Sequence, residues 1–416
     1  MEKDRIIPLP GEITAVLDIF ASAGVRAYIV GGAVRDSLMH RPVHDFDIAS
    51  PMLPEATAAL FTERGFRVIP TGIKHGTVTV LSGDMPVEVT AFRLDGSYTD
   101  GRHPDSVKFT SRIENDLSRR DFTVNAMAYS PQSGLCDPFG GEGDLHAGII
   151  RCVGDARVRF TEDALRILRA FRFAAVLGFE IDPSVLAAAR ELSERLSLIS
   201  AERIASETVK MMLAGQPSAY LASALECGVL GYVFRGVELR ASDFSVADRL
   251  PADAPLKIGA VLRRAGLSGP AVVGSALEAL RFSNTFYRRA YAAATVPLPV
   301  CEPAPVRRFL RETGNADAAI AAAVACGEPH AAGVAELARE IGAEGGPVTM
   351  QTLAVNGKKL RMAGFPAGRE MGRLLGALLD AVTADPSLND EATLMALARS
   401  IYEKTPKGKI YNEEYR

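Results

Sequence analysis

Two aspartates that stand one residue apart, Asp45 and Asp47, have the spacing of a metal site. The residues around Asp47 predict a short strand over Phe46–Ala49. Side chains at positions i and i+2 of a strand project from one face, so the two carboxylates are expected side by side, where they repel each other unless a cation lies between them. Divalent cations such as Mg²⁺ bind carboxylate oxygens and keep open positions for substrate phosphates. The spacing therefore predicts a magnesium-dependent site for phosphate transfer.

A glycine pair precedes the aspartates and predicts a phosphate-binding turn. An apolar run over residues 25–30 is typical of a buried strand. Gly31 and Gly32 follow it, and a short helix is expected over Ala33–Leu38. Glycine lets the backbone approach an anion that the amides of the following helix start would face, and Arg35 adds a positive charge. A Gly-Gly turn or an Asp-x-Asp pair alone is usually structural, but the full order of these features favours catalysis.

A second polar segment, residues 116–128, carries the arginine pair Arg119-Arg120. Guanidinium groups donate paired hydrogen bonds to phosphate oxygens, so the pair suits a triphosphate. Asp121 and Asn125 are four residues apart, which places them on one face of an expected helix. There they would hold a ribose hydroxyl or brace the arginines. The alternative is a helix start with surface ion pairs.

A third segment, Glu162–Phe173, has helical periodicity and the side chains needed to read a nucleobase. Its apolar residues cluster on one side of the expected helix: Ala164, Ile167, Leu168 and Phe171. Asp163 can accept a hydrogen bond from an exocyclic amino group while Arg166 donates to the adjacent ring nitrogen. Cytosine and adenine present that pattern, whereas guanine and uracil present a carbonyl beside an N–H. The pair predicts selection of CTP and ATP without a template; the alternative is an amphipathic helix with a solvated charged face.

The elements that must position these residues change character along the chain. Strand-like runs continue to about residue 148, and from Ile149 nearly every segment has helical spacing. The sequence thus predicts an α+β protein, with a mixed sheet and helices first and an all-α remainder. Within the sheet, Val87–Phe92 alternates, so Glu88 projects away from the apolar face. Glu88 is either a third metal-site carboxylate or a solvated strand residue.

Composition limits the class of protein. The 416 residues are 48% hydrophobic and 23% charged, which is typical of a soluble globular protein with roughly two to four domains. The net charge of −3 excludes a globally basic nucleic-acid binder, so any such contact must come from a local patch. The 5 cysteines are widely spaced without a C-x-x-C pair, which favours reduced thiols in a cytoplasm over disulfides or zinc. No apolar stretch suits a signal peptide or a membrane span.

Three segments have now been described: the Gly-Gly turn with its paired aspartates, the arginine-pair segment and the carboxylate-arginine helix. Taken in this order, they resemble the active-site motifs of the DNA polymerase β-like nucleotidyltransferases. Within them the chain resembles the class II tRNA nucleotidyltransferases, or CCA-adding enzymes, and the bacterial poly(A) polymerases, in a bacterial form without an HD domain. His40 and His44 have the spacing of a phosphohydrolase pair, but Pro42 breaks the helix that such a pair needs.

The resemblance implies four parts. These are a polymerase-β-like catalytic head at residues 1–148, a helical neck at 149–213, a helical body at 214–305 and a helical tail at 306–416. The tail would bind the tRNA elbow through its basic residues: Lys358, Lys359, Arg361, Arg369 and Arg373. Solvated surface charge is the alternative for these residues.

The resemblance also implies roles for the site residues. Asp45 and Asp47 would hold two Mg²⁺ ions. The nucleotide-binding residues, from the phosphates and sugar to the base, would be Gly32, Arg35, Arg120, Asp163, Arg166, Arg169 and Arg172. Arg169 and Arg172 enter from the resemblance alone, as the further arginines of the third motif.

The implied reaction is attack by the 3′-hydroxyl of an RNA on the α-phosphorus of CTP or ATP, with release of pyrophosphate. The expected acceptor is tRNA, which would gain its terminal CCA. The polar segment Asp95–Pro104 resembles the flexible loop that helps such enzymes accept the final nucleotide; a plain surface loop is the alternative. Relatives that add only CC, only A or a poly(A) tail stay open, as do an inactive RNA-binding protein on the same fold and a homodimer.

Overall fold

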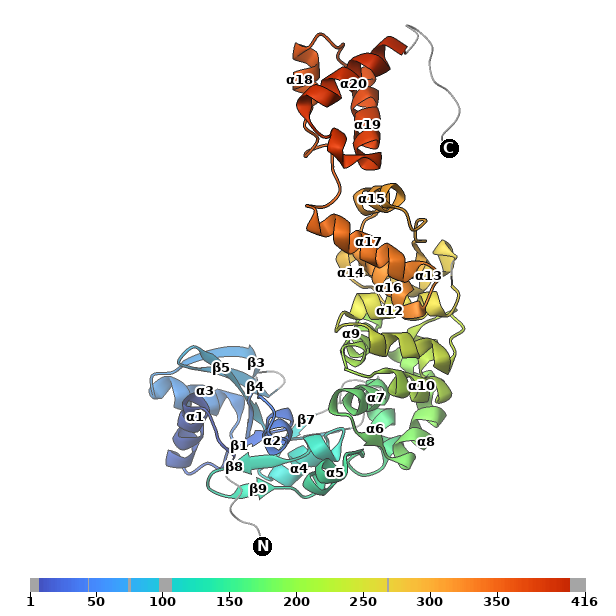
Figure 1. Cartoon of the computed structure of the whole chain (residues 1–416). Helices are drawn as coiled ribbons and strands as arrows, with labels where there is room; N and C mark the ends of the chain where they lie inside the picture. The colour runs from blue at the N-terminus through green and yellow to red at the C-terminus, as the bar shows by residue number, and fades with distance from the viewer. Residues whose placement is uncertain (1–6, 44, 74–75, 97–106, 268, 405–416) are drawn as a thin grey trace. The chain divides into compact units, whose positions relative to one another are not determined.

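The computed structural model describes residues 7–43, 45–73, 76–96, 107–267 and 269–404 (Figure 1). The chain forms two compact units, which are Met1–Asp248 with Glu278–Phe282, and Arg249–Leu277 with Ser283–Arg416. The sheet lies in the first unit, and the described part of the second unit is helical. This confirms the predicted α+β class, with a mixed sheet first and helices after it.

A 7-stranded sheet forms the centre of the first unit, in the order β3-β4-β5-β2-β1-β8-β9. Its strands are β1 (Tyr28–Val30), β2 (Asp47–Ser50), β3 (Arg67–Gly72), β4 (Thr77–Ser82), β5 (Met85–Ala91), β8 (Ala128–Ser130) and β9 (Gly134–Cys136). β2 and β5 are parallel and the other neighbouring pairs are antiparallel, so the sheet is mixed. The strands predicted at 25–30, 46–49 and 87–92 form its middle.

One face of the sheet is apolar and is covered by α1 (Gly11–Ser22) and α3 (Pro54–Glu63) (Figure 1). Alternation along β4 and β5 buries the valines on that face: Val78, Val80, Val87 and Val89. Phe20 of α1 meets Phe61 of α3 edge to face, with ring centroids 5.0 Å apart. The opposite face of the same strands is polar, and Glu88 projects from it as predicted.

Shorter elements connect this sheet to the helical part of the chain. They are α2 (Gly32–Leu38), the paired strands β6 (Arg93–Asp95) and β7 (Val107–Phe109), α4 (Ile113–Ser118), the 3₁₀ turn η2 (Thr123–Asn125) and α5 (Gly141–Ala147). Residues 97–106 lie outside the described residues, and they include most of the segment Asp95–Pro104 that was predicted as a loop; His44 lies outside them too.

From Ile149 the described chain is helical apart from two short strands, β10 (Ile149–Ile150) and β11 (Glu180–Ile181), which pair in parallel. The helical elements of this part are α6 (Ala156–Glu162), α7 (Leu165–Leu177), α8 (Pro183–Leu192), η3 (Ser193–Leu198), α9 (Ala201–Met212), α10 (Ser218–Glu226), α11 (Leu230–Val233) and η4 (Ala241–Arg249). Gly178 ends α7 with φ 77°, in the left-handed region that favours glycine.

The segment Glu162–Phe173 is not one helix, so that prediction was wrong. α6 ends at Glu162, Asp163 is extended with φ −142° and ψ 105°, and α7 begins at Leu165. The Asp163 side chain accepts a hydrogen bond from the Leu165 N–H at 3.0 Å and so satisfies a backbone donor at the start of α7. The apolar residues predicted for one side are buried nonetheless: Ala164, Ile167, Leu168 and Phe171.

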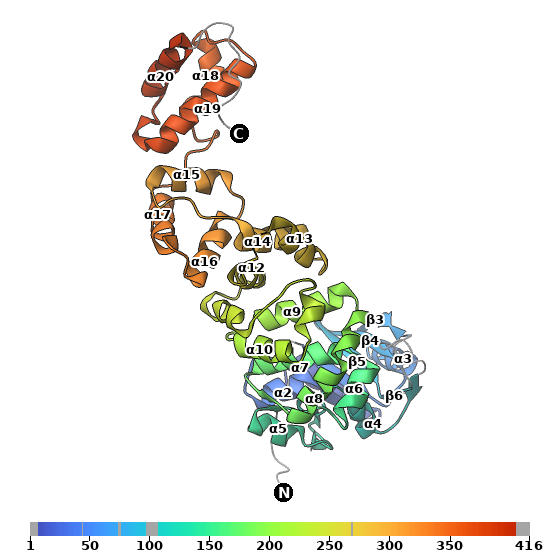
Figure 2. The same cartoon turned by 90° about the vertical axis from the view of Figure 1, so that its right-hand side faces the viewer.

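The second unit is built from short helices. They are α12 (Ala254–Arg264), α13 (Pro270–Glu278), α14 (Asn284–Thr295), α15 (Pro303–Glu312), α16 (Ala316–Cys326), α17 (Ala331–Ala343), α18 (Gly357–Met362), α19 (Arg369–Ala384), η5 (Pro386–Leu388) and α20 (Glu391–Lys404). Gly259 of α12 lies so close to α14 that an added Cβ would be 2.3 Å from the Ala290 carbonyl oxygen. α18, α19 and α20 pack around an apolar cluster of their own (Figure 2). In the described ranges, no helix has both the length and the apolar character to cross a bilayer.

Candidate active site

Asp45 and Glu88 both interact electrostatically with Asp47, on the polar side of the sheet. Asp47 is the first residue of β2, and the parallel register places it beside Glu88 of β5. All three side chains keep contact with solvent. Desolvation by the surrounding protein raises the pKa of Asp47, and the negative charges of Glu88 and Asp45 raise it further, while Arg120 opposes them. The site therefore gathers more negative charge than its protein neighbours balance.

These carboxylates fit the ligand preferences of a divalent cation. A cation beside Asp47 would relieve the repulsion that raises its pKa. Mg²⁺ commonly binds through one or two carboxylates and completes its coordination with water and substrate phosphates, which adjacent aspartates allow. Over the residues that the structure describes, no three Asp, Glu, His or Cys side chains form a ready-made metal cluster.

The glycine turn lies directly against the arginine pair. Gly31 has φ 70° and ψ −128°, and a Cβ built on it would be 2.8 Å from Nη1 of Arg120. The buried carboxylate of Asp116 holds both arginines, accepting from Arg119 at 2.8 Å and from Arg120 at 3.3 Å. Arg120 is also the cation that opposes the raised pKa of Asp47. The turn, the arginine pair and the carboxylates are therefore neighbours.

A chain of hydrogen bonds joins the first motif to the third. Arg35, in the helix that Gly32 begins, donates from Nη1 to Oδ1 of Asn125 at 2.6 Å. The Asn125 amide donates to Asp121 at 3.3 Å, and Asp121 accepts from Nε of Arg169 at 2.8 Å. Burial would raise the pKa of Asp121, but the charge and hydrogen bond of Arg169 keep it below its usual value. Asp121 is therefore an anion that fixes Arg169.

Asp121 and Asn125 meet without an α-helix between them, so the predicted helical face was wrong. Phe122 is extended, with φ −125° and ψ 147°, and forms an isolated β-bridge with Cys152. This pairing takes the backbone out of helical conformation, and only the 3₁₀ turn η2 follows. The two side chains nevertheless lie side by side, joined by the hydrogen bond from Asn125 to Asp121.

Asp163 and Arg166 are held by different neighbours. Oδ2 of Asp163 accepts from Arg203 of α9 at 2.8 Å, in addition to the contact of Oδ1 at the start of α7. Arg166 pairs with Glu162 at 2.5 Å and donates from Nη2 to the Arg119 carbonyl at 3.0 Å. Each side chain is thus fixed in place while keeping hydrogen-bonding capacity, since a carboxylate accepts about four hydrogen bonds and a guanidinium donates five.

The carboxylate site and the Asp163–Arg166 pair meet at the turn that contains Arg119 and Arg120. Arg120 contacts the glycine turn on one side, and the Arg119 carbonyl accepts from Arg166 on the other. The structure therefore brings the residues singled out by the sequence into one region of the first unit.

Several residues that sequence reasoning did not assign to the site hold its members in place. They are Asp116, Glu162, Arg203 and Glu207. Glu207 of α9 pairs with Nε of Arg172 at 2.7 Å, and burial lowers the pKa of that arginine despite this partner. The pairs within Asp116–Arg120 and Glu162–Arg166 have i,i+4 spacing and were readable from the sequence. The two that come from α9 have no local signal.

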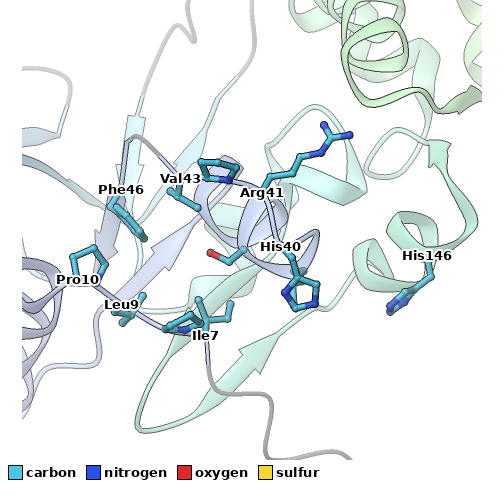
Figure 3. A pocket seen from close by; sticks show the side chains of 12 residues that line it. Ile7, Leu9, Pro10, His40, Arg41, Val43, Phe46 and His146 are labelled. Atoms are coloured by element: carbon cyan, nitrogen blue, oxygen red, sulfur yellow. The ribbon is translucent and has the colours of Figure 1, made fainter.

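A separate cavity of about 1010 Å³ lies beside the segment that leads into β2 (Figure 3). Phe46, which stands between Asp45 and Asp47 in the sequence, lines it. Figure 3 shows Pro10 with Phe46 at one end and His146 at the other. The lining is mainly apolar, unlike the site itself.

Two protein-family models match the chain. The model described as "Poly A polymerase head domain" matches residues 27–151, and the model described as "Probable RNA and SrmB- binding site of polymerase A" matches residues 178–239. The first match contains every strand of the 7-stranded sheet.

Curated relatives match about half of the chain. The CCA-adding enzyme of Leuconostoc citreum (strain KM20) is 45% identical over 232 residues, which are 55% of this chain and 57% of that protein. The CCA-adding enzyme of Streptococcus sanguinis (strain SK36) is 46% identical over 213 residues, 50% of this chain and 52% of that protein. The chain thus spans little more than half the length of these relatives.

Solved structures extend the likeness to nearly the full chain. The Bacillus stearothermophilus CCA-adding enzyme, solved in complex with CTP, is 31% identical with a TM-score of 0.78, over 95% of this chain and 100% of that chain. The Thermotoga maritima CCA-adding enzyme, solved with tRNA, has a TM-score of 0.71 at 20% identity, over 95% of this chain and 96% of that chain, and at this identity shows the fold alone.

Proposed function

Because the chain belongs to the CCA-adding enzyme family, as its motifs predicted, we propose that it is a template-independent nucleotidyltransferase that adds CCA to the 3′ end of tRNA. The tRNA 3′-hydroxyl attacks the α-phosphorus of CTP or ATP, one P–O bond forms, and pyrophosphate leaves. One observation carries the proposal: Asp163 and Arg166 are both fixed at the start of α7, with Arg166 bonded to the turn that also holds Arg120.

Base selection follows from this pair. The Asp163 carboxylate accepts a hydrogen bond from the exocyclic amino group of cytosine or adenine, and Arg166 donates to the adjacent ring nitrogen. Guanine and uracil would turn a carbonyl oxygen toward the carboxylate and an N–H toward the guanidinium. Both contacts are unfavourable, so these bases are rejected without a template strand.

Asp45 and Asp47 are the proposed ligands of Mg²⁺, with Glu88 as a third carboxylate. When bound, the metal would lower the pKa of the attacking hydroxyl and neutralise charge on the triphosphate. Two observations support its inclusion over a role as a solvated strand residue. Glu88 stands in register with Asp47, and after burial its charge is the next cause of the raised pKa of Asp47.

Replacing Glu88 with glutamine is expected to raise the Mg²⁺ concentration for half-maximal activity by about 10-fold or more, since even the outer-shell partners of a metal site typically cost about 10–100-fold in affinity when they are replaced. The control is Glu63→Gln, an exposed glutamate at the end of α3 on the other face of the sheet. Magnesium titrations of initial rate compare the two variants. Identical magnesium curves for Glu88→Gln and the wild type would mean that Glu88 is a solvated strand residue and not part of the metal site.

Gly32, Arg35 and Arg120 are the proposed phosphate and sugar contacts. Arg120 lies against Gly31, where only glycine leaves room for its guanidinium. Arg169 and Arg172 complete the nucleotide pocket, and their carboxylate partners fix them within it.

Replacing Gly31 with alanine is expected to raise the KM for CTP by about 10-fold, because the new methyl group displaces the Arg120 guanidinium from its position. The matched control is Gly24→Ala, since Gly24 also has a positive φ, of 73°, but a Cβ there meets nothing within 4 Å. Both variants place an alanine at positive φ, and the strain is larger at Gly31, whose ψ of −128° lies outside the left-handed helical region. Thermal unfolding measures the strain of each variant, and initial-rate kinetics measure the effect of the contact on KM. If the two variants have the same KM, the Arg120 contact has no part in nucleotide binding.

The chain is proposed to consist of a head (1–148), a neck (149–213), a body (214–305) and a tail (306–416). The parts beyond the nucleotide site are proposed to bind and place the tRNA. In the tail, Lys359 is already paired with Glu391 at 2.6 Å. The other basic residues proposed for the tRNA elbow are exposed: Lys358, Arg361, Arg369 and Arg373. This activity belongs in the cytoplasm, where tRNA matures in a bacterium.

The test uses three tRNA transcripts that end before CCA, after C and after CC. The full chain is incubated with Mg²⁺ and with CTP or ATP, singly and together, and Asp45→Ala serves as the inactive control. Extension of all three transcripts to complete CCA, lost in the control, supports the proposal.

Other outcomes would replace it. Cytidine added only to the first two transcripts indicates a CC-adding enzyme, and adenosine added only to the last indicates an A-adding enzyme. Long adenosine tails indicate a poly(A) polymerase. No extension of any transcript refutes the transferase and leaves RNA binding to be measured directly.

A further inference from the structure

Phe173 is surrounded by three guanidinium groups that come from two helices. The central carbon of Arg172 is 3.5 Å from the ring centroid, that of Arg169 is 5.2 Å away and that of Arg35 is 5.4 Å away. The ring is 7% exposed, and Phe122 packs against it edge to face with centroids 5.7 Å apart. The ring therefore sits inside the arginine cluster and is almost closed to solvent.

Three cations around one ring repel each other unless other groups compensate. Each guanidinium has one carboxylate partner: Arg35 with Asp36 at 2.9 Å, Arg169 with Asp121 at 2.6 Å and Arg172 with Glu207 at 2.7 Å. These carboxylates come from three separate segments of the chain, so they draw the arginines in different directions. The ring is the element that all three cations share, and the negative face of an aromatic ring attracts cations.

The three arginines connect the two ends of the proposed nucleotide site. Arg35 belongs to the glycine-turn helix on the phosphate side, and Arg169 and Arg172 belong to α7, whose start carries the base-reading pair. A change in the ring would therefore move groups at both ends together. A change in Asp36 or Glu207 would release a single arginine, whereas Asp121 also reaches Arg35 through Asn125.

We infer that Phe173 is a positioning residue for nucleotide binding, which sets the places of Arg35, Arg169 and Arg172 through cation–π contacts without itself binding the nucleotide. This inference rests on the proposed function of the same site. It assigns the ring an electrostatic role, distinct from the packing role of Phe171, the other buried aromatic side chain of α7.

The test measures the equilibrium dissociation constants of CTP and ATP with the full chain and Mg²⁺, without tRNA. Phe173→Leu is expected to raise both constants by about 10-fold, and Phe173→Tyr, which keeps the ring face, to stay within about 2-fold of the wild type. The matched control is Phe171→Leu, because Phe171 is fully buried on the apolar side of the same helix. It should lower thermal stability with little effect on nucleotide affinity. Equal losses of affinity in Phe171→Leu and Phe173→Leu would overturn the inference.

A second measurement separates charge from packing. Phenylalanine analogues at position 173 with one, two and three ring fluorines weaken the negative face of the ring in steps while keeping its shape. The dissociation constants should rise with each fluorine; constants that do not change across the series would overturn the inference. The proposed function is tested apart from this, because it fails if the wild-type chain extends no tRNA, whatever the effect of Phe173 on CTP binding.

Discussion

Replacing Asp47 with asparagine is expected to reduce CMP and AMP addition to tRNA by about 1000-fold or more, since a lost charged ligand removes several kcal/mol of transition-state stabilisation. Asparagine keeps the size of the side chain and removes only its charge. Selection between nucleotides should be preserved, because Asp163 and Arg166 are untouched. Single-turnover rates on the three transcripts measure the effect, and Asp84→Asn, in the exposed turn between β4 and β5, is the control.

The same variant should not lose stability when metal is absent. Burial and the charges of Glu88 and Asp45 raise the pKa of Asp47, so its ionised form is less favourable in the folded chain than in the unfolded chain. A carboxyl with a raised folded pKa destabilises the fold above its unfolded pKa, and a neutral side chain relieves that cost. In EDTA at pH 7 the thermal midpoint of Asp47→Asn should equal or exceed that of the wild type. If Asp47→Asn is unfolded, its low rate says nothing about catalysis. If it is folded, activity within about 10-fold of wild type would contradict the metal role.

Replacing Asp163 with asparagine is expected to lower kcat/KM for both CTP and ATP by about 100-fold and to admit UTP, in keeping with about 1–3 kcal/mol for a bidentate base contact. The asparagine amide can donate to the O4 carbonyl of uracil, which the carboxylate repels. The N–H of uracil still faces the Arg166 guanidinium, so UTP use should stay below the use of CTP. The asparagine oxygen can still accept the Leu165 N–H, so the start of α7 is kept, but the amide that replaces Oδ2 no longer accepts from Arg203.

Competition assays with all four nucleoside triphosphates on a transcript lacking CCA measure this change of preference. The matched control is Asp155→Asn, because Asp155 caps α6 in the same way, accepting the Arg157 N–H at 2.7 Å, but is exposed. A uniform loss of rate with unchanged rejection of UTP would mean that Asp163 supports the helix and does not read the base.

The parts of the fold that sequence could predict are those with local causes. The alternation of Val87–Phe92 requires a half-buried strand, and the observed β5 buries Val87 and Val89 while exposing Glu88. The order of glycines, Arg35 and paired aspartates restricts the first motif to a turn between strands, which is where the structure has it. The sequence could not show that Glu88 stands beside Asp47, because that register joins strands with α3, β3 and β4 between them.

The parts that could not be predicted depend on partners far along the chain. The helical period continues unbroken through Glu162–Phe173, but Asp163 leaves the helix, and Arg203, 40 residues later, holds it there. Asp121 fixes Arg169 from 48 residues away. Charge and spacing identify such residues as candidates, yet they do not say which carboxylate faces which guanidinium, because only the packing of α7 and α9 decides it.

The two members of the base-reading pair are anchored to different parts of the first unit. Arg203 of α9 holds Asp163, whereas the Arg119 carbonyl, which is 47 residues before Arg166, holds the guanidinium. The gap between carboxylate and guanidinium therefore depends on where α9 packs relative to that turn. Cytosine and adenine offer the same edge from rings of different size, so a small change in this gap alters the ratio of CTP to ATP use. Nucleotide preference can thus change through substitutions in helix packing that leave every base-reading residue unchanged.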